Sequence, residues 1–124
     1  MTTPALLVED NETIRLTLIP TMEELADVVV ISIAESADDA IAAVKSRDDW
    51  KLIVIDLFLK GGTGLEVLEA CKGRHDWQHA VVLTNYATVD TRERCLQRGA
   101  DAVFDKSTQL DEFLTYCAAL AFAP

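Results

Sequence analysis

Five polar side chains that could act together on an anion each follow a short apolar run of the sequence. They are Glu9, Asp10, Asp56, Thr84 and Lys106. Three carboxylates that converge repel one another unless they are protonated or neutralised. Mg²⁺ is suited to neutralise such a group, because it binds a few carboxylate oxygens together with waters and a substrate phosphate. If the five side chains meet in the fold, we expect a Mg²⁺ site with phosphate chemistry.

The reaction that this set favours is nucleophilic attack on phosphorus. A carboxylate beside a metal can attack and form an acyl phosphate. We expect Asp56 to be the nucleophile because it ends the most apolar run, whereas Glu9 and Asp10 open a loop that suits metal ligation. Thr84 and Lys106 are the candidate donors to the new phosphoryl oxygens. Each residue taken singly could be an ordinary cap, turn or solvated side chain, so their joint placement carries the prediction.

The elements that must position these residues alternate along the chain. The central run, residues 52–56, is uninterrupted and apolar up to its Asp, which is typical of a strand buried on both faces of a parallel sheet. Similar runs predict strands at 5–8, 28–33, 80–84 and 102–105. Apolar residues at helical spacing predict helices at 12–26, from 36 onward, 65–71, 89–98 and 110–121.

Five strands that alternate with five helices predict an α/β fold. The expected fold is a flavodoxin-like, doubly wound, five-stranded parallel sheet in the order 2-1-3-4-5, with helices on both faces. This order brings the C-terminal strand ends, and the polar residues that follow them, to one crevice. Local signals predict a cap at Ser36, a kink at Pro20, a C-cap at Gly99 and a capping box at Thr108 with Asp111.

Composition limits the class of protein. The chain has 124 residues, half of them apolar, which suits one domain over 1–124. Eleven basic and 21 acidic residues give a net charge of −10, which argues against binding to nucleic acid or anionic membranes. No signal-peptide pattern or apolar run of transmembrane length is present, so we expect a cytoplasmic protein whose three cysteines are reduced core residues.

Four short motifs resemble the receiver domain of two-component response regulators, of the single-domain, chemotaxis-regulator-like kind, over nearly the whole chain. They are LLVEDN (6–11), VIDLFLKGGTG (54–64), VVLTNYA (81–87) and GADAVFDKS (99–107). The resemblance implies that Asp56 accepts a phosphoryl group from a phosphohistidine on a sensor histidine kinase or phosphotransfer protein. It implies that Mg²⁺ is bound by Glu9, Asp10, Asp56 and the main-chain carbonyl of Phe58. Thr84 and Lys106 would then bind the phosphoryl oxygens.

The resemblance also implies a signalling protein rather than an enzyme. Phosphorylation would shift a population and repack the face formed by the fourth helix, fifth strand and fifth helix, where an output protein would bind. No residues follow the last helix to form an output domain. Unless the chain is a piece of a longer protein, we therefore expect output through partner contacts or an onward phosphorelay.

The sequence departs from the family pattern at the switch and around the mouth of the site. Val103 occupies the position of the usual switch aromatic, and the adjacent Phe104 should face the other way. Tyr86 could substitute for that aromatic. Ser107 replaces the usual proline after the lysine, so the preceding peptide bond should be trans.

Three bulky side chains near the phosphorylation mouth predict restricted access. Asn85 is expected to narrow the approach of the phosphoryl group. Phe58 and Tyr86 flank the mouth, which predicts slow attack by water and a long-lived acyl phosphate.

Three other functions remain as alternatives. An aspartyl-nucleophile phosphatase of the haloacid-dehalogenase kind would need a second Asp where Phe58 stands. A flavin or nucleotide binder would need a phosphate loop, and the sequence has neither a Walker A motif nor GxGxxG. A degenerate receiver that serves only as an interaction module is disfavoured by the intact acidic, hydroxyl and lysine set, although the altered switch positions are compatible with it.

Overall fold

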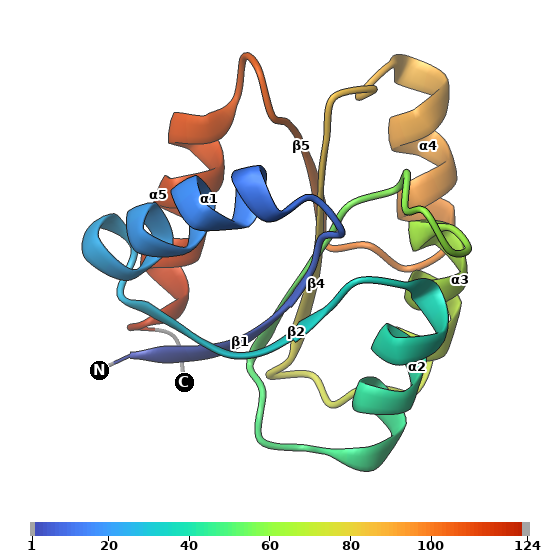
Figure 1. Ribbon diagram of the computed structural model, residues 1–124, viewed down its shortest axis with the longest axis horizontal. Coiled ribbons are helices and arrows are strands. Elements are labelled where there is room, and N and C mark those ends of the chain that lie inside the picture. The colour runs from blue at the N-terminus through green and yellow to red at the C-terminus, as the bar shows by residue number, and fades with distance from the viewer. Residues whose placement is uncertain (1, 123–124) are drawn as a thin grey trace.

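A parallel sheet of five strands forms the centre of the computed structural model, which describes residues 2–122 (Figure 1). The strands lie in the order β2-β1-β3-β4-β5, and every neighbouring pair is parallel. Their bounds are β1 Thr3–Val8, β2 Val28–Ala34, β3 Leu52–Ile55, β4 His79–Thr84 and β5 Ala102–Asp105. The predicted α/β fold and strand order are confirmed.

Helices cover both faces of this sheet, as the alternation of elements predicted. Their bounds are α1 Glu12–Leu25, α2 Ala37–Ser46, α3 Gly64–Ala70, the 3₁₀ turn η1 Cys71–Gly73, α4 Val89–Gln97 and α5 Leu110–Leu120. Helices α1 and α5 lie on one face, and α2, α3 and α4 lie on the other (Figure 1). Within residues 2–122, no helix is both long and apolar enough to cross a bilayer.

Strand β3 explains why two cores form. Its four residues are buried, and they alternate between the two faces of the sheet. Ile53 and Ile55 pack in the cluster under α2, α3 and α4, whereas Leu52 and Val54 pack in the cluster under α1 and α5. The strand ends at Ile55, so Asp56 is the first residue beyond it and lies at the C-terminal edge of the sheet.

Two of the three predicted helix-end signals are confirmed. Ser36 caps α2 by accepting the Asp39 N–H at 3.1 Å. Gly99 has a φ of +95° just beyond α4, and its N–H donates to the Leu96 carbonyl at 3.0 Å, as expected of a C-cap glycine. Helix α1 runs continuously through Pro20. The three cysteines are free and buried, as predicted.

The predicted capping box at Thr108 and Asp111 is wrong. Helix α5 begins at Leu110 after Gln109, whose side chain makes no cap hydrogen bond. The Asp105 carboxylate accepts the N–H groups of Ser107 at 2.7 Å and of Thr108 at 3.1 Å. Since these bonds form a turn over 105–108, the helix begins after the turn rather than at Thr108. The described residues contain no cis peptide bond, so the bond between Lys106 and Ser107 is trans, as expected.

Candidate functional site

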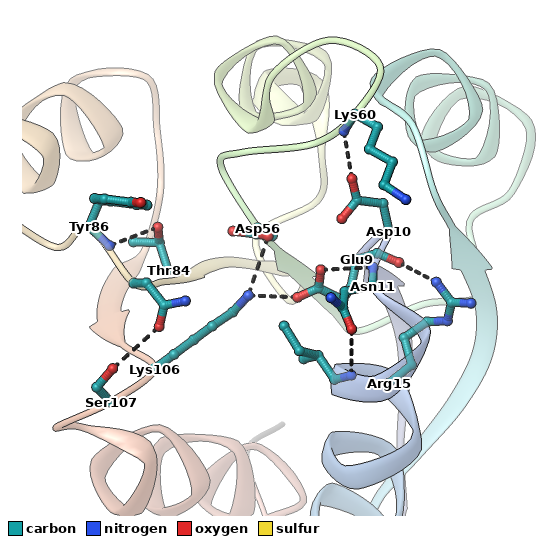
Figure 2. Close-up of polar contacts among 12 residues, drawn as sticks. Glu9, Asp10, Asn11, Arg15, Asp56, Lys60, Thr84, Tyr86, Lys106 and Ser107 are labelled. Carbon is teal, nitrogen blue, oxygen red and sulfur yellow. Dashed lines mark hydrogen bonds and ion pairs between the residues drawn. The ribbon is translucent and has the colours of Figure 1, made fainter.

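The acidic residues that the sequence singled out come together at the C-terminal edge of the sheet (Figure 2). Glu9 and Asp10 follow β1, and Asp56 follows the neighbouring strand β3. One carboxylate oxygen from each lies within 4.8 Å of the other two. Glu9 and Asp56 are buried, with exposed fractions of 2% and 9%. Carboxylates this close and this shielded from water repel one another unless one is protonated or a positive charge lies among them.

Lys106 supplies part of that charge. Its Nζ lies 2.6 Å from Glu9 Oε1 and 3.3 Å from Asp56 Oδ2 (Figure 2). The lysine begins the loop after β5, and its main-chain N–H donates to the carbonyl of Thr84 at 2.9 Å. This bond joins the ends of β4 and β5 and directs the ammonium group across the site. One ammonium among three carboxylates leaves the site with an excess of negative charge.

Burial of Asp56 and the charges around it both affect its pKa. Burial raises the pKa of the Asp56 carboxyl above its ordinary value, the Lys106 ammonium lowers it, and the charge on Glu9 raises it again. The net direction is upward. The site therefore opposes the charged form of Asp56, and an added cation would relieve this cost.

This pKa shift predicts how stability depends on pH without metal. Because its pKa is raised in the fold, Asp56 binds its proton more tightly there than in the unfolded chain. The stabilisation that the protonated Asp56 gives to the fold is therefore lost as the pH rises from the ordinary carboxyl pKa through the raised one. An Asp56→Asn variant avoids this loss, so we expect it to unfold at higher urea concentration than the wild type at neutral pH in EDTA. The difference should shrink as the pH is lowered, and a pH-independent difference would contradict this account.

Two residues that the sequence analysis did not identify, Lys60 and Arg15, hold the acidic loop in place. The main-chain N–H of Lys60, in the loop after β3, donates to Asp10 Oδ2 at 2.6 Å. Arg15 donates from Nη1 to the main-chain carbonyl of Glu9 at 2.9 Å and pairs through Nη2 with Glu35 at 2.9 Å. Arg15 is the only basic residue among the first 44, and this isolation beside an acidic loop is the signal that could have identified it.

Asn11, and not Glu9 or Asp10, caps helix α1. Its Oδ1 accepts the Ile14 N–H at 3.0 Å and so caps α1. Its main-chain N–H donates to Glu9 Oε2 at 3.2 Å. Since Asn11 satisfies the helix end, the carboxylates of Glu9 and Asp10 point toward Asp56 and the loop after β3 instead (Figure 2).

Two aromatic rings form the outer rim of the site. The centroids of Phe58 and Tyr86 lie 4.7 Å apart, with an edge-on angle of 66° between the ring planes. Both side chains are more than half exposed. They border a cavity of about 190 Å³ whose walls also include Asn85 and Lys106 as well as the three carboxylates. Access to Asp56 therefore passes beside an aromatic pair.

The other three predicted residues, Thr84, Val103 and Phe104, lie in or beside β4 and β5. Thr84 is fully buried at the end of β4, and its hydroxyl accepts the Tyr86 N–H at 3.2 Å. Val103 is buried in the core cluster that contains Cys95 of α4. Phe104 points to the opposite face, as strand alternation predicted, where its ring meets Phe113 at 5.8 Å.

Comparison with known proteins gives consistent matches. The model of the response regulator receiver domain matches residues 5–118. The acid tolerance regulatory protein ActR of Rhizobium meliloti (strain 1021) is 36% identical over 110 residues, which cover 89% of this chain and 56% of that protein. The chain thus spans about half the length of this curated relative.

Solved structures show the same fold. A two-component response regulator of the LuxR family from Aurantimonas sp. SI85-9A1 superposes with a TM-score of 0.85 at 21% identity, over 98% of this chain and 87% of that chain. A response regulator protein from Burkholderia pseudomallei, solved with a phosphorylated aspartic acid, calcium ion and citrate, superposes with a TM-score of 0.75 at 24% identity. It covers 97% of this chain and 71% of that chain.

Proposed function

The chain belongs to the response regulator receiver domain family, and from this premise we propose that Asp56 is its phosphoacceptor. The phosphodonor is a phosphohistidine on a sensor histidine kinase or a phosphotransfer protein. The observation that carries the proposal is the position of Asp56 directly after β3, 3.3 Å from Lys106 and within a cluster of three carboxylates. Output follows through protein contacts at α4, β5 and α5 or through onward phosphotransfer, in the cytoplasm.

The donor set fits Mg²⁺. Glu9, Asp10 and Asp56 offer hard oxygen ligands that are already close together, and the main-chain carbonyl of Phe58 is the fourth candidate from the protein. When bound, Mg²⁺ neutralises the carboxylates and stabilises negative charge on phosphoryl oxygens. The raised pKa of Asp56 supports this assignment, because burial and the charge on Glu9 both oppose ionisation of Asp56 and a bound cation would favour it.

The side chains of the site suggest how the transfer proceeds. A carboxylate oxygen of Asp56 attacks the phosphorus atom, the P–N bond to the donor imidazole breaks, and the imidazole leaves with the electron pair. Lys106 exchanges its contact with Asp56 for one with a phosphoryl oxygen. The Thr84 hydroxyl, which accepts the Tyr86 N–H at 3.2 Å, rotates to donate to another phosphoryl oxygen.

The test combines metal binding with phosphorylation of the full chain. Titration with Mg²⁺ should change the amide chemical shifts of residues 9, 10 and 56–58, and acetyl phosphate should then add one phosphoryl group by intact mass. EDTA should prevent the gain. Shifts with Mg²⁺ but no gain from acetyl phosphate or from a phosphorylated histidine protein would instead support the degenerate receiver that acts only through contacts.

The aromatic rim predicts a long-lived phosphoryl group. Because Phe58 and Tyr86 contact each other at the mouth, they restrict the approach of water to the acyl phosphate. A Phe58→Asn, Tyr86→Glu variant should lose its phosphoryl group roughly tenfold faster, which corresponds to about 1.4 kcal/mol in the barrier. The measurement is the decay of the phosphorylated mass after the donor is removed.

A matched control is available at the other end of the sheet. Trp77 is also partly exposed and stacks on His75, with ring centroids 5.4 Å apart. A Trp77→Asn variant should keep the wild-type lifetime. If the rim variant decays no faster than this control, the rim does not limit hydrolysis.

A further inference from the structure

The junction between α4 and β5 has no aromatic residue at the position where the family pattern places one. Val103 occupies that position and is buried. Of the two nearby aromatics, Phe104 contacts Phe113 and Tyr116 on the face covered by α5. Tyr86 contacts Phe58 at the rim of the site. Each ring is thus engaged in another contact, which leaves a role for a polar carrier between the site and the α4–β5–α5 face.

An arginine on α4, Arg92, forms hydrogen bonds with the loop before α4, with β5 and with the start of α5. Arg92 donates from Nε to the carbonyl of Ala87 at 3.0 Å and from Nη1 to the carbonyl of Val103 at 2.8 Å. Its Nη2 donates to Oε1 of Gln109, the residue before α5. One guanidinium thus joins the loop before α4, the edge strand β5 and the start of α5.

Both ends of this bridge adjoin residues of the site. Ala87 lies three residues after Thr84, in the short loop that also carries Tyr86. Gln109 Oε1 accepts the main-chain N–H of Asp105 at 3.0 Å, and Asp105 directly precedes Lys106. Each end of the bridge is thus connected to Thr84 or Lys106 through no more than three residues or one hydrogen bond.

We infer that Arg92, together with Gln109, couples the phosphorylation site to the α4–β5–α5 face in place of a switch aromatic. This inference rests on the proposed function. A guanidinium is a planar fork with fixed donor directions, so its three bonds depend on the relative positions of their three partners. Displacement of the loop before α4 breaks the bond to Ala87 or pulls Arg92, and Gln109 then passes the change to α5. Gln109 Nε2 also donates to Glu112 at 2.8 Å, which continues this series of hydrogen bonds into α5.

Two variants test the contacts of Arg92 and those of Gln109 separately. Arg92→Met keeps an unbranched apolar stem but removes every donor. Gln109→Met leaves Arg92 bound to Ala87 and Val103 and removes the side-chain contacts of Gln109 with Arg92, the Asp105 N–H and Glu112. Arg94→Met is the control, because Arg94 lies on the same helix but pairs at 3.2 Å with Asp90 of α4 itself.

The measurement is the change in amide chemical shifts when beryllofluoride and Mg²⁺, a mimic of the phosphoryl group, are added to the full chain. The wild type and Arg94→Met should shift around residue 56, residue 84, β5 and the start of α5. Arg92→Met should keep the shifts around 56 and 84 and lose those in β5 and α5. Gln109→Met should lose only those in α5, and urea unfolding of each variant shows that it is folded.

The outcomes distinguish the inference from its premise. If the wild type shows no shift around residue 56, the proposed function fails. If both bridge variants are folded and shift α5 as the wild type does, Arg92 is merely structural and the inference fails while the proposed function stands. If Arg92→Met does not fold, Gln109→Met decides alone, because wild-type shifts in its α5 would overturn the inference.

Discussion

Incubation with acetyl phosphate and Mg²⁺ should add one phosphoryl group to the wild-type chain and none to an Asp56→Asn variant. The carboxamide has no anionic oxygen to attack phosphorus, so the expected loss is complete. We expect the other two carboxylates to be poor substitutes, because three of their four oxygens already bind other groups. Glu9 binds Lys106 and the Asn11 N–H through its two oxygens, and Asp10 accepts the Lys60 N–H. Intact mass gives the readout.

An Asp76→Asn variant is the matched control for this result. Asp76 is exposed in the segment before β4, at the end of the sheet opposite the site. Its replacement by Asn is the same chemical change as at Asp56. It should gain the phosphoryl group as the wild type does. Urea unfolding of Asp56→Asn in the same Mg²⁺ buffer shows whether a loss of phosphorylation reflects unfolding. A phosphoryl group on Asp56→Asn would place the acceptor on another residue.

A single methyl group added at Gly64 should destabilise the fold by about 3 kcal/mol. A Cβ there would lie 2.5 Å from the main-chain carbonyl oxygen of Asp56 and 2.9 Å from Leu57 Cα. These are backbone atoms of the segment that carries the phosphoacceptor, so they cannot rotate aside. Gly64 also begins α3, and its N–H donates to the Leu57 carbonyl at 3.0 Å. Gly64→Ala should therefore shift Asp56 and slow phosphorylation as well as lower the free energy of unfolding.

Gly73 provides the control, because a Cβ at this position would meet no atom within 4 Å. Gly73→Ala should change the free energy of unfolding by no more than about 0.5 kcal/mol and leave phosphorylation unchanged. Urea unfolding of the three proteins tests both expectations. Equal stability of the two variants would show that the loop after β3 can move away from α3 at little cost.

Local physical chemistry determined most of the fold from the sequence. An apolar run such as 52–55 must be buried on both faces, and a carboxylate directly after it must lie at the strand end. Strict alternation with helices makes the sheet parallel, and parallel strands bring all their C-terminal ends to one edge. Topology therefore placed Glu9, Asp10, Asp56 and Lys106 together without any knowledge of their contacts.

The helix ends show where local signals fail. The pair Thr108 and Asp111 has the spacing of a capping box, yet α5 starts only at Leu110. Asp105, which lies at the end of a strand, accepts the Thr108 N–H that Asp111 would have bound in a capping box. A capping signal predicts a helix start only where no neighbouring side chain competes for the free donors.

Only the tertiary structure determined how the site is held and connected. The contacts of Arg15 with the Glu9 carbonyl, of Arg92 with the Val103 carbonyl, and of Phe58 with Tyr86 join segments that periodicity treats separately. Two of these contacts end on main-chain carbonyl groups, which every residue possesses and which no sequence pattern marks. The formation of these contacts depends on how each helix and loop packs on the sheet. The sequence therefore established which groups could act, and the packing decided which of them contact one another.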